Sequence, residues 1–215
     1  MGAIPDLEME RSLRRQGCRL VVGLDEVGRG AWAGPVVAGA VAFPLDLANL
    51  EKRLTGIRDS KQLSPRQRES LLPTIQQTAL AVGLGFVSAA QVDRMGIVPA
   101  TRQAMLLALV ELGLYPDYLL IDALPLPIHI PQRAIIRGDA QCLSIAAASI
   151  VAKVARDRWM IAQENRYSGY GFAWHKGYGT AQHRQALERL GPCPLHRLSF
   201  APCRPHLPDF PPRDS

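Results

Sequence analysis

The stretch LVVGLDEVGRGAWAGPVV, Leu20–Val37, decides the fold. An apolar run leads into two adjacent carboxylates, Asp25 and Glu26, and a Gly-Arg-Gly triplet separates them from a second apolar run. Because the link between the runs is too short for a helix, they predict neighbouring antiparallel strands at 19–27 and 33–43. Acids seldom end an apolar strand unless their charge is used, so this turn is the first candidate site.

The rest of the chain mixes extended and helical patterns. Residues 79–87 predict a third strand that completes a meander. Ser64–Gln67 is typical of a helix start with a capping box, and Gly113 ends a later helix. The other predicted elements are strands at 117–123 and 133–138 and helices at 65–77, 99–112, 144–165 and 180–190. This order indicates an α/β fold, with a mixed sheet flanked by helices.

Composition divides the chain into three parts. Residues 1–17 form a polar lead-in with room for one short helix, and residues 18–200 form one folded body. The final stretch, APCRPHLPDFPPRDS, is rich in proline and predicts a disordered tail over 201–215.

The charge of the chain points to its partners. The 215 residues carry a formal net charge of +6, which favours a polyanion such as nucleic acid. The N-terminal region lacks the apolar segment of a secretory signal, and no apolar run reaches the length of a membrane span without a charged residue, Gly or Pro. These features predict a cytoplasmic protein that does not associate with membranes. Since no interface pattern stands out, a monomer is the expected state.

Two of the four cysteines belong to a CxxH…CxxH pattern, Cys193–His196 and Cys203–His206. The residue types and their local spacing would suit zinc. The loop between the two pairs is short and prolines crowd both of them, so free thiols in a reducing compartment are the favoured interpretation.

Three predicted strands end in carboxylates. These are Asp25 with Glu26, Asp122, and Asp139. A single acid at a strand end is usually a turn former, but strand ends cluster along one edge of a mixed sheet, so these acids should converge. Clustered carboxylates repel one another unless they bind cations or their pKa values rise. Oxygen ligands suit Mg²⁺ or Mn²⁺, and two such ions are the usual device for attack of water on a phosphodiester.

The glycines after the acids are explained both by the backbone conformation that they permit and by the close approach of a ligand that they allow. Neighbouring residues of a strand face opposite sides, so Asp25 and Glu26 can share one site only where the strand ends and bends. Gly28 and Gly30 supply that freedom and bare the backbone to a ligand, while Arg29 offers a cation to phosphate. The alternatives are a solvated turn or a nucleotide loop, although the segment lacks the ending of a P-loop and the GxGxxG spacing.

Six blocks of the sequence together resemble the ribonuclease HII family, the type 2 ribonucleases H. They are DEVGRGAWAGPVVAGAV, RDSKQLSPRQRE, LLIDAL, IRGDAQCLSIAAASIVAKVARDRWM, HKGYGTAQH and GPCPLHRLSF, in family order from about Arg19 to Phe200. The resemblance implies a ribonuclease H-like mixed five-stranded sheet flanked by helices, with a helical C-terminal part. This fold agrees with the order of elements predicted above.

The resemblance also implies an activity. Such an enzyme cuts the RNA strand of RNA–DNA hybrids and nicks 5′ of single ribonucleotides embedded in duplex DNA, leaving 3′-hydroxyl and 5′-phosphate ends. It would therefore serve ribonucleotide excision repair. The catalytic and metal-binding acids of the family match Asp25, Glu26, Asp122 and Asp139, which would hold two Mn²⁺ or Mg²⁺ ions during catalysis.

Substrate-binding residues carry over in the same way. Gly28, Arg29 and Gly30 match the loop that senses the 2′-hydroxyl, the local difference between RNA and DNA. Tyr178 matches a tyrosine that stacks on the deoxyribose after the ribonucleotide, and Lys61 matches a lysine near the substrate phosphate. Basic residues that would contact the nucleic-acid backbone or simply be solvated are Lys153, Lys176 and Arg184.

Other residues in these blocks indicate structural roles. Asp157 is expected to form an ion pair or hydrogen bond rather than to be a ligand. His175 is expected to pack, with proton transfer or phosphate contact as the alternative, and His196 is expected to cap or pack the last helix. Trp32 departs from the smaller residue or proline more common at this point of the family, which affects the local packing of the loop.

Two other functions remain open from the sequence. A junction resolvase or transposase would carry acids on similar strands, but it would not need the Gly-Arg-Gly loop and Tyr178 as a 2′-hydroxyl sensor. A nucleic-acid-binding module with a decayed site is disfavoured because all four acids are present. A sliding clamp is compatible as a partner, although the LPDF of the tail is too little to identify one.

Overall fold

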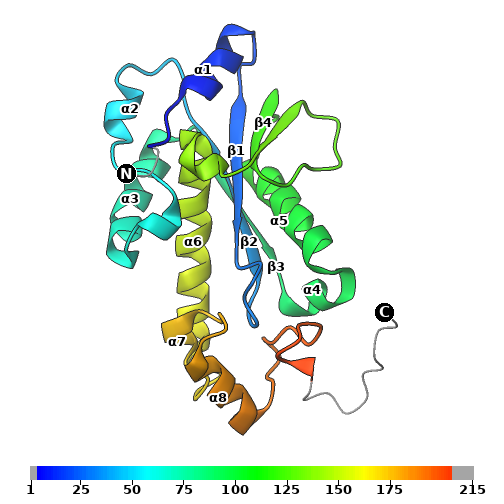
Figure 1. Ribbon diagram of the computed structural model, residues 1–215. Coiled ribbons are helices and arrows are strands. Elements are labelled where there is room, and N and C mark those ends of the chain that lie inside the picture. The colour runs from blue at the N-terminus through cyan, green and yellow to red at the C-terminus, as the bar shows by residue number, and fades with distance from the viewer. Residues whose placement is uncertain (1–3, 205–215) are drawn as a thin grey trace.

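The computed structural model describes residues 4–204 and contains a five-stranded sheet with strand order β3-β2-β1-β4-β5 (Figure 1). The strands are β1 (Val21–Val27), β2 (Val36–Ala42), β3 (Ala81–Val87), β4 (Tyr118–Asp122) and β5 (Gln132–Ile135). β1 pairs antiparallel with β2, and β2 with β3, which confirms the predicted meander. β1 also pairs in parallel with β4, and β4 with β5, so β1 is the central strand of a mixed sheet.

The central strand is paired over different lengths on its two sides. The antiparallel ladder with β2 continues to Val27. The parallel ladder with β4 ends at Leu24, opposite Ile121. Beyond Leu24 one edge of β1 is therefore free while the other remains paired, and the sheet opens where Asp25 and Glu26 lie.

One long helix covers each face of the sheet. α6 (Leu143–Gln163) packs against one face and α5 (Ile97–Leu112) against the other (Figure 1). Four alanines of α6, Ala146, Ala147, Ala148 and Ala152, are buried, as expected of a helix that lies close to a sheet. The strands contribute to this approach, because a Cβ at Gly23 would lie 2.3 Å, and one at Gly39 2.5 Å, from the backbone of α6. Close packing on this face thus depends on small residues in both layers.

Helix starts follow the predicted signals. In α3 (Pro65–Thr78) the Ser64 side chain accepts a hydrogen bond from the Gln67 N–H, and the Gln67 side chain accepts one from the Ser64 N–H. Pro73 lies inside α3 without ending it. α5 begins two residues before Pro99, which occupies the first turn, where its missing N–H costs no intrahelical bond.

Several short elements were not predicted. They are α2 (Leu50–Arg53), α4 (Ala89–Met95), α7 (Phe172–His175) and the 3-10 turns η1 (Ser60–Gln62) and η2 (Gly138–Ala140). α1 (Glu8–Arg15) is the short helix expected in the lead-in, and α8 (Ala181–Leu190) begins at its predicted Thr180 cap. Within residues 4–204, no helix combines the length and the apolar character that crossing a membrane requires.

The strand predicted at 133–138 is too long. β5 ends at Ile135, and Arg137 has φ +55°, a left-handed conformation that breaks the extended chain. Asp139 therefore lies in η2 and not at a strand end. The expectation that this acid follows directly from a strand is wrong, although the short turn still brings it to the same edge of the sheet.

The folded body reaches beyond the predicted limits of 18–200. In α1, the buried Glu10 accepts hydrogen bonds from the backbone N–H and the hydroxyl of Ser144, at the start of α6. At the other end Cys203 is buried, so the chain remains packed through that residue. The rest of the predicted tail, 205–215, lies outside the described residues.

Candidate active site

Three carboxylates meet where the sheet opens. Asp25 and Glu26 belong to β1, and Asp122 is the last residue of β4. One oxygen of each lies within 4.8 Å of the others. Asp25 is buried, and its Oδ1 accepts a hydrogen bond from the Glu26 N–H at 2.7 Å. The prediction that the strand must end for both acids to share a site is wrong, because β1 stays paired with β2 and the early end of the β4 ladder provides the space.

Asp139 lies beside this group without belonging to its closest set. Burial, followed by the charges of Asp59 and Asp122, raises the pKa of Asp139 to about 6. The Gly138 N–H donates to Asp122 Oδ1 at 2.8 Å and so ties η2 to the end of β4. A hollow of about 710 Å³ is lined by Asp59, Lys61, Asp122 and Asp139 among others. All four predicted acids thus face one edge of the sheet. Asp59 lies beside them, and sequence reasoning missed it although it stands in the RDSK block.

The acids are held together against their mutual repulsion. Burial, followed by the charges of Glu26 and Asp122, raises the pKa of Asp25 well above its usual value. Burial also raises the pKa of Glu26, although Arg29 opposes this shift through an ion pair of 3.3 Å. Groups that resist ionisation in this way indicate a site that lacks a counter-charge.

The arrangement of oxygens fits a divalent cation. Glu26 Oε2 is buried and has no hydrogen-bond donor among the described residues. An acceptor without a donor, inside a cluster of like charges, is completed by a bound cation. Carboxylate oxygens are hard ligands that suit Mg²⁺ and Mn²⁺. Asp25, Glu26 and Asp122 are therefore the residues that would hold a cation, with Asp139 next to them.

A second hollow, of about 370 Å³, adjoins the acids and collects the predicted substrate residues. Its lining includes Glu26, Gly28, Arg29, Gly30, Lys61, Lys153 and Tyr178. These residues come from distant parts of the chain, so their meeting is a property of the fold. Glu26 lines this hollow and also belongs to the acidic cluster, which makes the two regions continuous.

The two glycines of the loop have different roles. Gly28 has φ +90°, and a Cβ there would lie 2.3 Å from Nε of Arg156, so only glycine fits. Gly30 does not have a left-handed φ, and a Cβ there would meet no atom within 4 Å. The prediction of conformational freedom is right for Gly28 and wrong for Gly30, whose missing side chain leaves open space at the hollow.

Two buried arginines support this loop, and sequence reasoning missed both. Arg156 of α6 donates to the carbonyls of Pro35 and Lys176. Arg197 donates to the carbonyl of Arg29 at 2.9 Å. A loop rich in glycine has carbonyls that need donors, but nothing in the sequence says which cations supply them.

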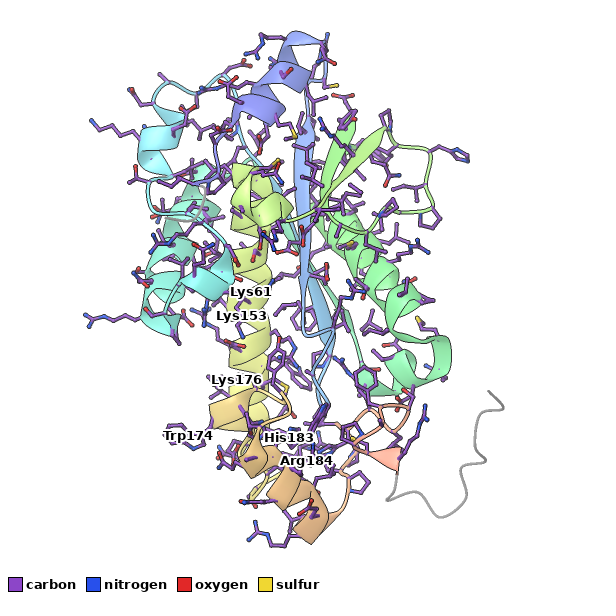
Figure 2. The ribbon with its side chains drawn as sticks, viewed as in Figure 1. Lys61, Lys153, Trp174, Lys176, His183 and Arg184 are labelled. Atoms are coloured by element: carbon purple, nitrogen blue, oxygen red, sulfur yellow. The ribbon has the colours of Figure 1, made fainter. Side chains whose placement is uncertain are left out.

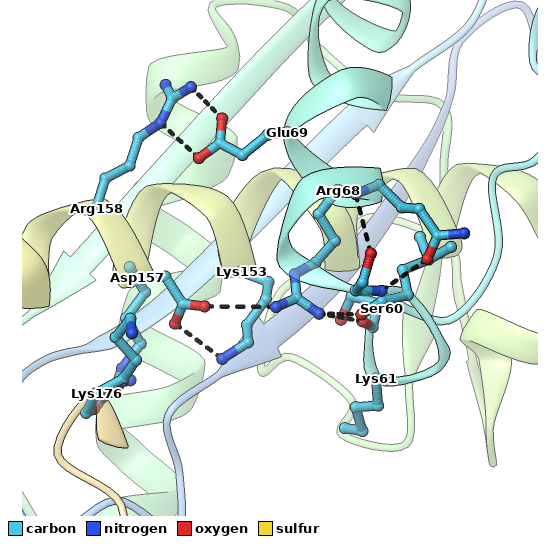
Figure 3. A network of polar contacts seen from close by, with 12 residues as sticks. Ser60, Lys61, Arg68, Glu69, Lys153, Asp157, Arg158 and Lys176 are labelled. Carbon is cyan, nitrogen blue, oxygen red and sulfur yellow. Dashed lines mark hydrogen bonds and ion pairs between the residues drawn. The ribbon is translucent and has the colours of Figure 1, made fainter. Parts of the chain in front are cut away.

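Lys61 borders both hollows. Burial lowers its pKa, but the carboxylates of Asp25, Asp139 and other nearby acids outweigh this effect and raise the pKa. The turn that carries Lys61 is held by Arg68, whose guanidinium donates to the Ser60 carbonyl at 2.7 Å (Figure 3). The lysine thus lies beside the acidic cluster, and its contact with a phosphate stays a prediction.

Asp157 is a structural partner, as predicted. Its carboxylate pairs with Lys153 at 2.8 Å and with Arg68 at 3.7 Å (Figure 3). Lys153 Nζ also lies 5.4 Å from the centre of the Tyr178 ring. Lys153 therefore forms a wall of the hollow and is not an extended surface cation.

The other basic candidates lie toward α7 and α8 (Figure 2). The ammonium of Lys176 donates to the carbonyls of Ala173 and Trp174, so it caps its own helix. Arg184 is exposed, with its guanidinium 5.2 Å from the centre of the Trp32 ring. Of these two residues, Arg184 is the better placed to meet a nucleic-acid backbone.

His175 and His196 are buried, in agreement with the packing roles predicted for them. His196 Nδ1 accepts a hydrogen bond from the Cys193 N–H at 2.9 Å, and its Nε2 lies 3.1 Å from His183 Nε2. Both ring nitrogens are thus engaged within the protein, which argues against zinc at the Cys193–His196 pair. All four cysteines are free thiols, and His206 lies outside the described residues.

A mixed sheet of this order, with carboxylates at its opened central edge and a basic hollow beside them, defines a hydrolase of the ribonuclease H-like class. The ribonuclease HII family model matches residues 22–203. The ribonuclease HII of Chloroflexus aurantiacus is 52% identical over 200 residues, which are 93% of this chain and 94% of that protein. That of Geobacillus kaustophilus is 50% identical over 198 residues, 92% of this chain and 74% of that protein. The chain belongs to the ribonuclease HII family and is an endoribonuclease.

Solved structures agree with this assignment. The ribonuclease H2 of Pyrococcus horikoshii matches with a TM-score of 0.72 and 25% identity, over 86% of this chain and 96% of that chain. The ribonuclease HII of Archaeoglobus fulgidus, solved in a complex with PCNA, matches with a TM-score of 0.70 and 26% identity, over 84% and 95%. These matches confirm the predicted fold, and the family accounts for cleavage of the RNA strand of RNA–DNA hybrids.

Proposed function

We propose that this endoribonuclease also nicks 5′ of single ribonucleotides embedded in duplex DNA and leaves 3′-hydroxyl and 5′-phosphate ends. The observation that carries the proposal is the continuity of the two regions of the site. Glu26 belongs to the acidic cluster and lines the hollow that holds the Gly-Arg-Gly loop and Tyr178. One nucleotide could therefore present its phosphate to the acids and its sugar to the loop.

The acids have the binding role in this proposal. Asp25, Glu26, Asp122 and Asp139 would hold two Mg²⁺ or Mn²⁺ ions. When bound, such ions lower the pKa of water and stabilise the charge on the phosphate and on the leaving oxygen. Glu26 stays oriented because its Oε1 is paired with Arg29, while Oε2 is buried without a donor among the described residues. Lys61, beside these acids, is placed to contact the substrate phosphate.

The hollow has the recognition role. Gly30 has open space where a side chain would be, so a 2′-hydroxyl could approach its backbone closely. The Arg29 guanidinium is held by Glu26, which leaves the backbone of the loop as the probe of the sugar. The Tyr178 ring lines the same hollow, where it would stack on the following deoxyribose and disfavour a second 2′-hydroxyl.

A binding module without catalysis fits this site less well, because all four acids are in place. A resolvase-like nuclease would have no use for a hollow that combines a bare backbone with a tyrosine. We keep the monomer and the cytoplasm as parts of the proposal. A sliding clamp is a candidate partner, because the Archaeoglobus fulgidus relative was solved in a complex with PCNA.

The test is cleavage of labelled duplex DNA with one ribonucleotide, in Mg²⁺ or Mn²⁺, beside an all-DNA duplex and a uniform RNA–DNA hybrid. The expected result is a single cut 5′ of the ribonucleotide, no cut in the all-DNA duplex, and a product that a ligase can reseal. Asp122→Asn should bind the same duplex without cutting it. Cleavage of the hybrid without any cut at the single ribonucleotide would refute the finer specificity and leave the family activity intact.

A further inference from the structure

The segment that carries Tyr178 has an unfavourable backbone. Lys176 has φ +52° and Gly177 has φ +81°, two consecutive left-handed residues of which only one is glycine. A left-handed residue with a side chain costs about 1 kcal/mol, so neighbouring groups must hold the segment in place. The proposed function uses Tyr178, which this segment carries.

Three buried histidines form a cluster next to the segment. His175 and His183 stack with ring centres 4.3 Å apart, and His183 and His196 lie 5.2 Å apart. Two of them bond to the segment directly. His175 Nδ1 accepts a hydrogen bond from the Gly177 N–H at 3.1 Å, and His183 Nδ1 lies 2.9 Å from the Tyr178 carbonyl oxygen.

The partners of His183 and His196 fix where their protons lie. A carbonyl only accepts, so His183 must donate from Nδ1 to Tyr178, and its Nε2 is then an acceptor when the ring is neutral. His196 must therefore donate from Nε2 to His183 across 3.1 Å. His196 Nδ1 is then left as an acceptor, and the Cys193 N–H donates to it at 2.9 Å.

The result is a one-directional chain of hydrogen bonds from Cys193 through His196 and His183 to Tyr178. Moving the His183 proton to Nε2 would set two acceptors face to face at the Tyr178 carbonyl, and moving the His196 proton to Nδ1 would set two acceptors face to face between the rings. A second proton on His183, at Nε2, would set two donors face to face between the rings. Burial lowers the pKa of His183 to about 4, in keeping with the neutral state that the chain needs.

We propose that His183, oriented by His196, is a positioning residue for Tyr178 and thereby sets the preference of the enzyme for the junction between a ribonucleotide and a deoxyribonucleotide. The proposal rests on the proposed function for the role of Tyr178 at the sugar. His183 itself is buried beneath the segment and acts only through the Tyr178 backbone.

Two isosteric substitutions separate the contacts of His183. In His183→Asn the amide nitrogen occupies the place of Nδ1 and keeps the bond to Tyr178. In His183→Gln the amide reaches the place of Nε2, where its oxygen accepts from His196, and the bond to Tyr178 is lost. Thr101→Val is the matched control, because Thr101 is fully buried and bonded in α5, away from this segment.

The first measurement is hydrogen–deuterium exchange over residues 176–180. His183→Gln should exchange about tenfold faster there than the natural protein, the effect of one lost hydrogen bond, while His183→Asn stays near the natural rate. Thr101→Val should leave this segment unchanged. Equal exchange in the Gln and Asn variants would overturn the proposal, and this readout does not depend on activity.

The second measurement is the ratio of cleavage rates on a single-ribonucleotide duplex and a uniform hybrid. His183→Gln should lower this ratio in the natural background and have no further effect when Tyr178→Ala is present, since both changes act through one ring. Additive losses would contradict a role through Tyr178. If the natural protein fails to cut the single-ribonucleotide duplex, the proposed function fails, and the exchange measurement alone decides on the positioning.

Discussion

The molecule contains two buried clusters of titratable side chains, and they differ in how their hydrogen bonds and charges are satisfied. In the acidic cluster, burial and like charges raise the pKa of Asp25, and Glu26 Oε2 has no donor among the described residues. In the histidine cluster, each contact pairs a donor with an acceptor in a single neutral arrangement. The acidic cluster is incomplete without an added cation, whereas the histidine cluster is complete with protein groups.

This difference distinguishes a cluster that binds a ligand from a cluster that holds the surrounding fold in place. Buried polar groups that lack partners are costly, so a fold retains them where a ligand completes them. A satisfied cluster rigidifies its surroundings and needs nothing from solvent. The hollow lined by the Gly-Arg-Gly loop includes Glu26 of one cluster and Tyr178, which the other cluster bonds. One region would therefore act on the phosphate while the other holds the group that reads the sugar.

The largest expected effect comes from removing one acid. Asp25→Asn should lower cleavage of an RNA–DNA hybrid about a thousandfold or more, because metal ions supply several kcal/mol of charge stabilisation in such reactions. Gel-based cleavage under single-turnover conditions measures this loss. Asp46→Asn is the control, since it removes an exposed carboxylate paired with Arg14 and should leave the rate unchanged. A similar loss in both variants would contradict the assignment.

The pH dependence of stability should separate the two clusters in metal-free protein. His183 has a folded pKa of about 4 against a usual 6.5, so only the unfolded chain takes up a proton as the pH falls between these values. Acidification from pH 6.5 to 4 should therefore lower the free energy of unfolding by about 3 kcal/mol through this residue. Asp139 is shifted upward, to about 6, so the folded state takes up the proton and acidification through pH 6 adds stability.

Urea unfolding between pH 7 and pH 4.5, with a chelator present, measures how the free energy of unfolding changes with pH through each residue. His183→Asn should remove the loss of stability on acidification, and Asp139→Asn should remove the gain. Changes of the same sign in the two variants would refute the contrast between the clusters.

Cation binding should stabilise only through the acidic cluster. At a concentration a hundredfold above its dissociation constant, Mn²⁺ should raise the free energy of unfolding by about 2.7 kcal/mol. Asp122→Asn should lose most of this gain, while His183→Asn retains it. Without metal, Asp25→Asn should be more stable than the natural protein, because it removes a charge repelled by Glu26 and Asp122. Thermal melts with and without the ion provide the comparison.

The smallest effects concern the loop between the clusters. Gly28→Ala should destabilise the protein by about 1–2 kcal/mol, because φ is +90° there and Arg156 fills the space. Gly30→Ala should leave the melting temperature unchanged and lower cleavage at the single ribonucleotide, since only the substrate would meet the added methyl. If Gly30→Ala cleaves normally, the loop backbone does not read the sugar.

The sequence predicted the sheet and the acids well because both leave local signals. The period and ends of the apolar runs indicated the strands, and Asp25, Glu26 and Asp122 stand directly at those ends. Asp139 was assigned to a strand end because a left-handed Arg137 leaves no mark in the sequence.

The supports of the site could not be predicted, because they depend on tertiary contacts. Arg156 looks like a solvated cation on an alanine-rich helix, yet it is fully buried among loop carbonyls. Similarly, His183 and His196 are separated in sequence, and their pairing becomes visible only when the chain is folded. Motifs identified these blocks without giving the contacts between them.

The support of the Gly-Arg-Gly loop by Arg197 has a consequence for folding kinetics. The hydrogen bond from Arg197 to the Arg29 carbonyl spans 168 residues, and Ala33 forms a bridge with His196. Contacts between such distant residues require the closure of long loops and form slowly. We expect the sheet to assemble before the recognition loop is fixed, so that the enzyme becomes competent late in folding. Loss of Arg197 should accordingly speed unfolding far more than it slows folding.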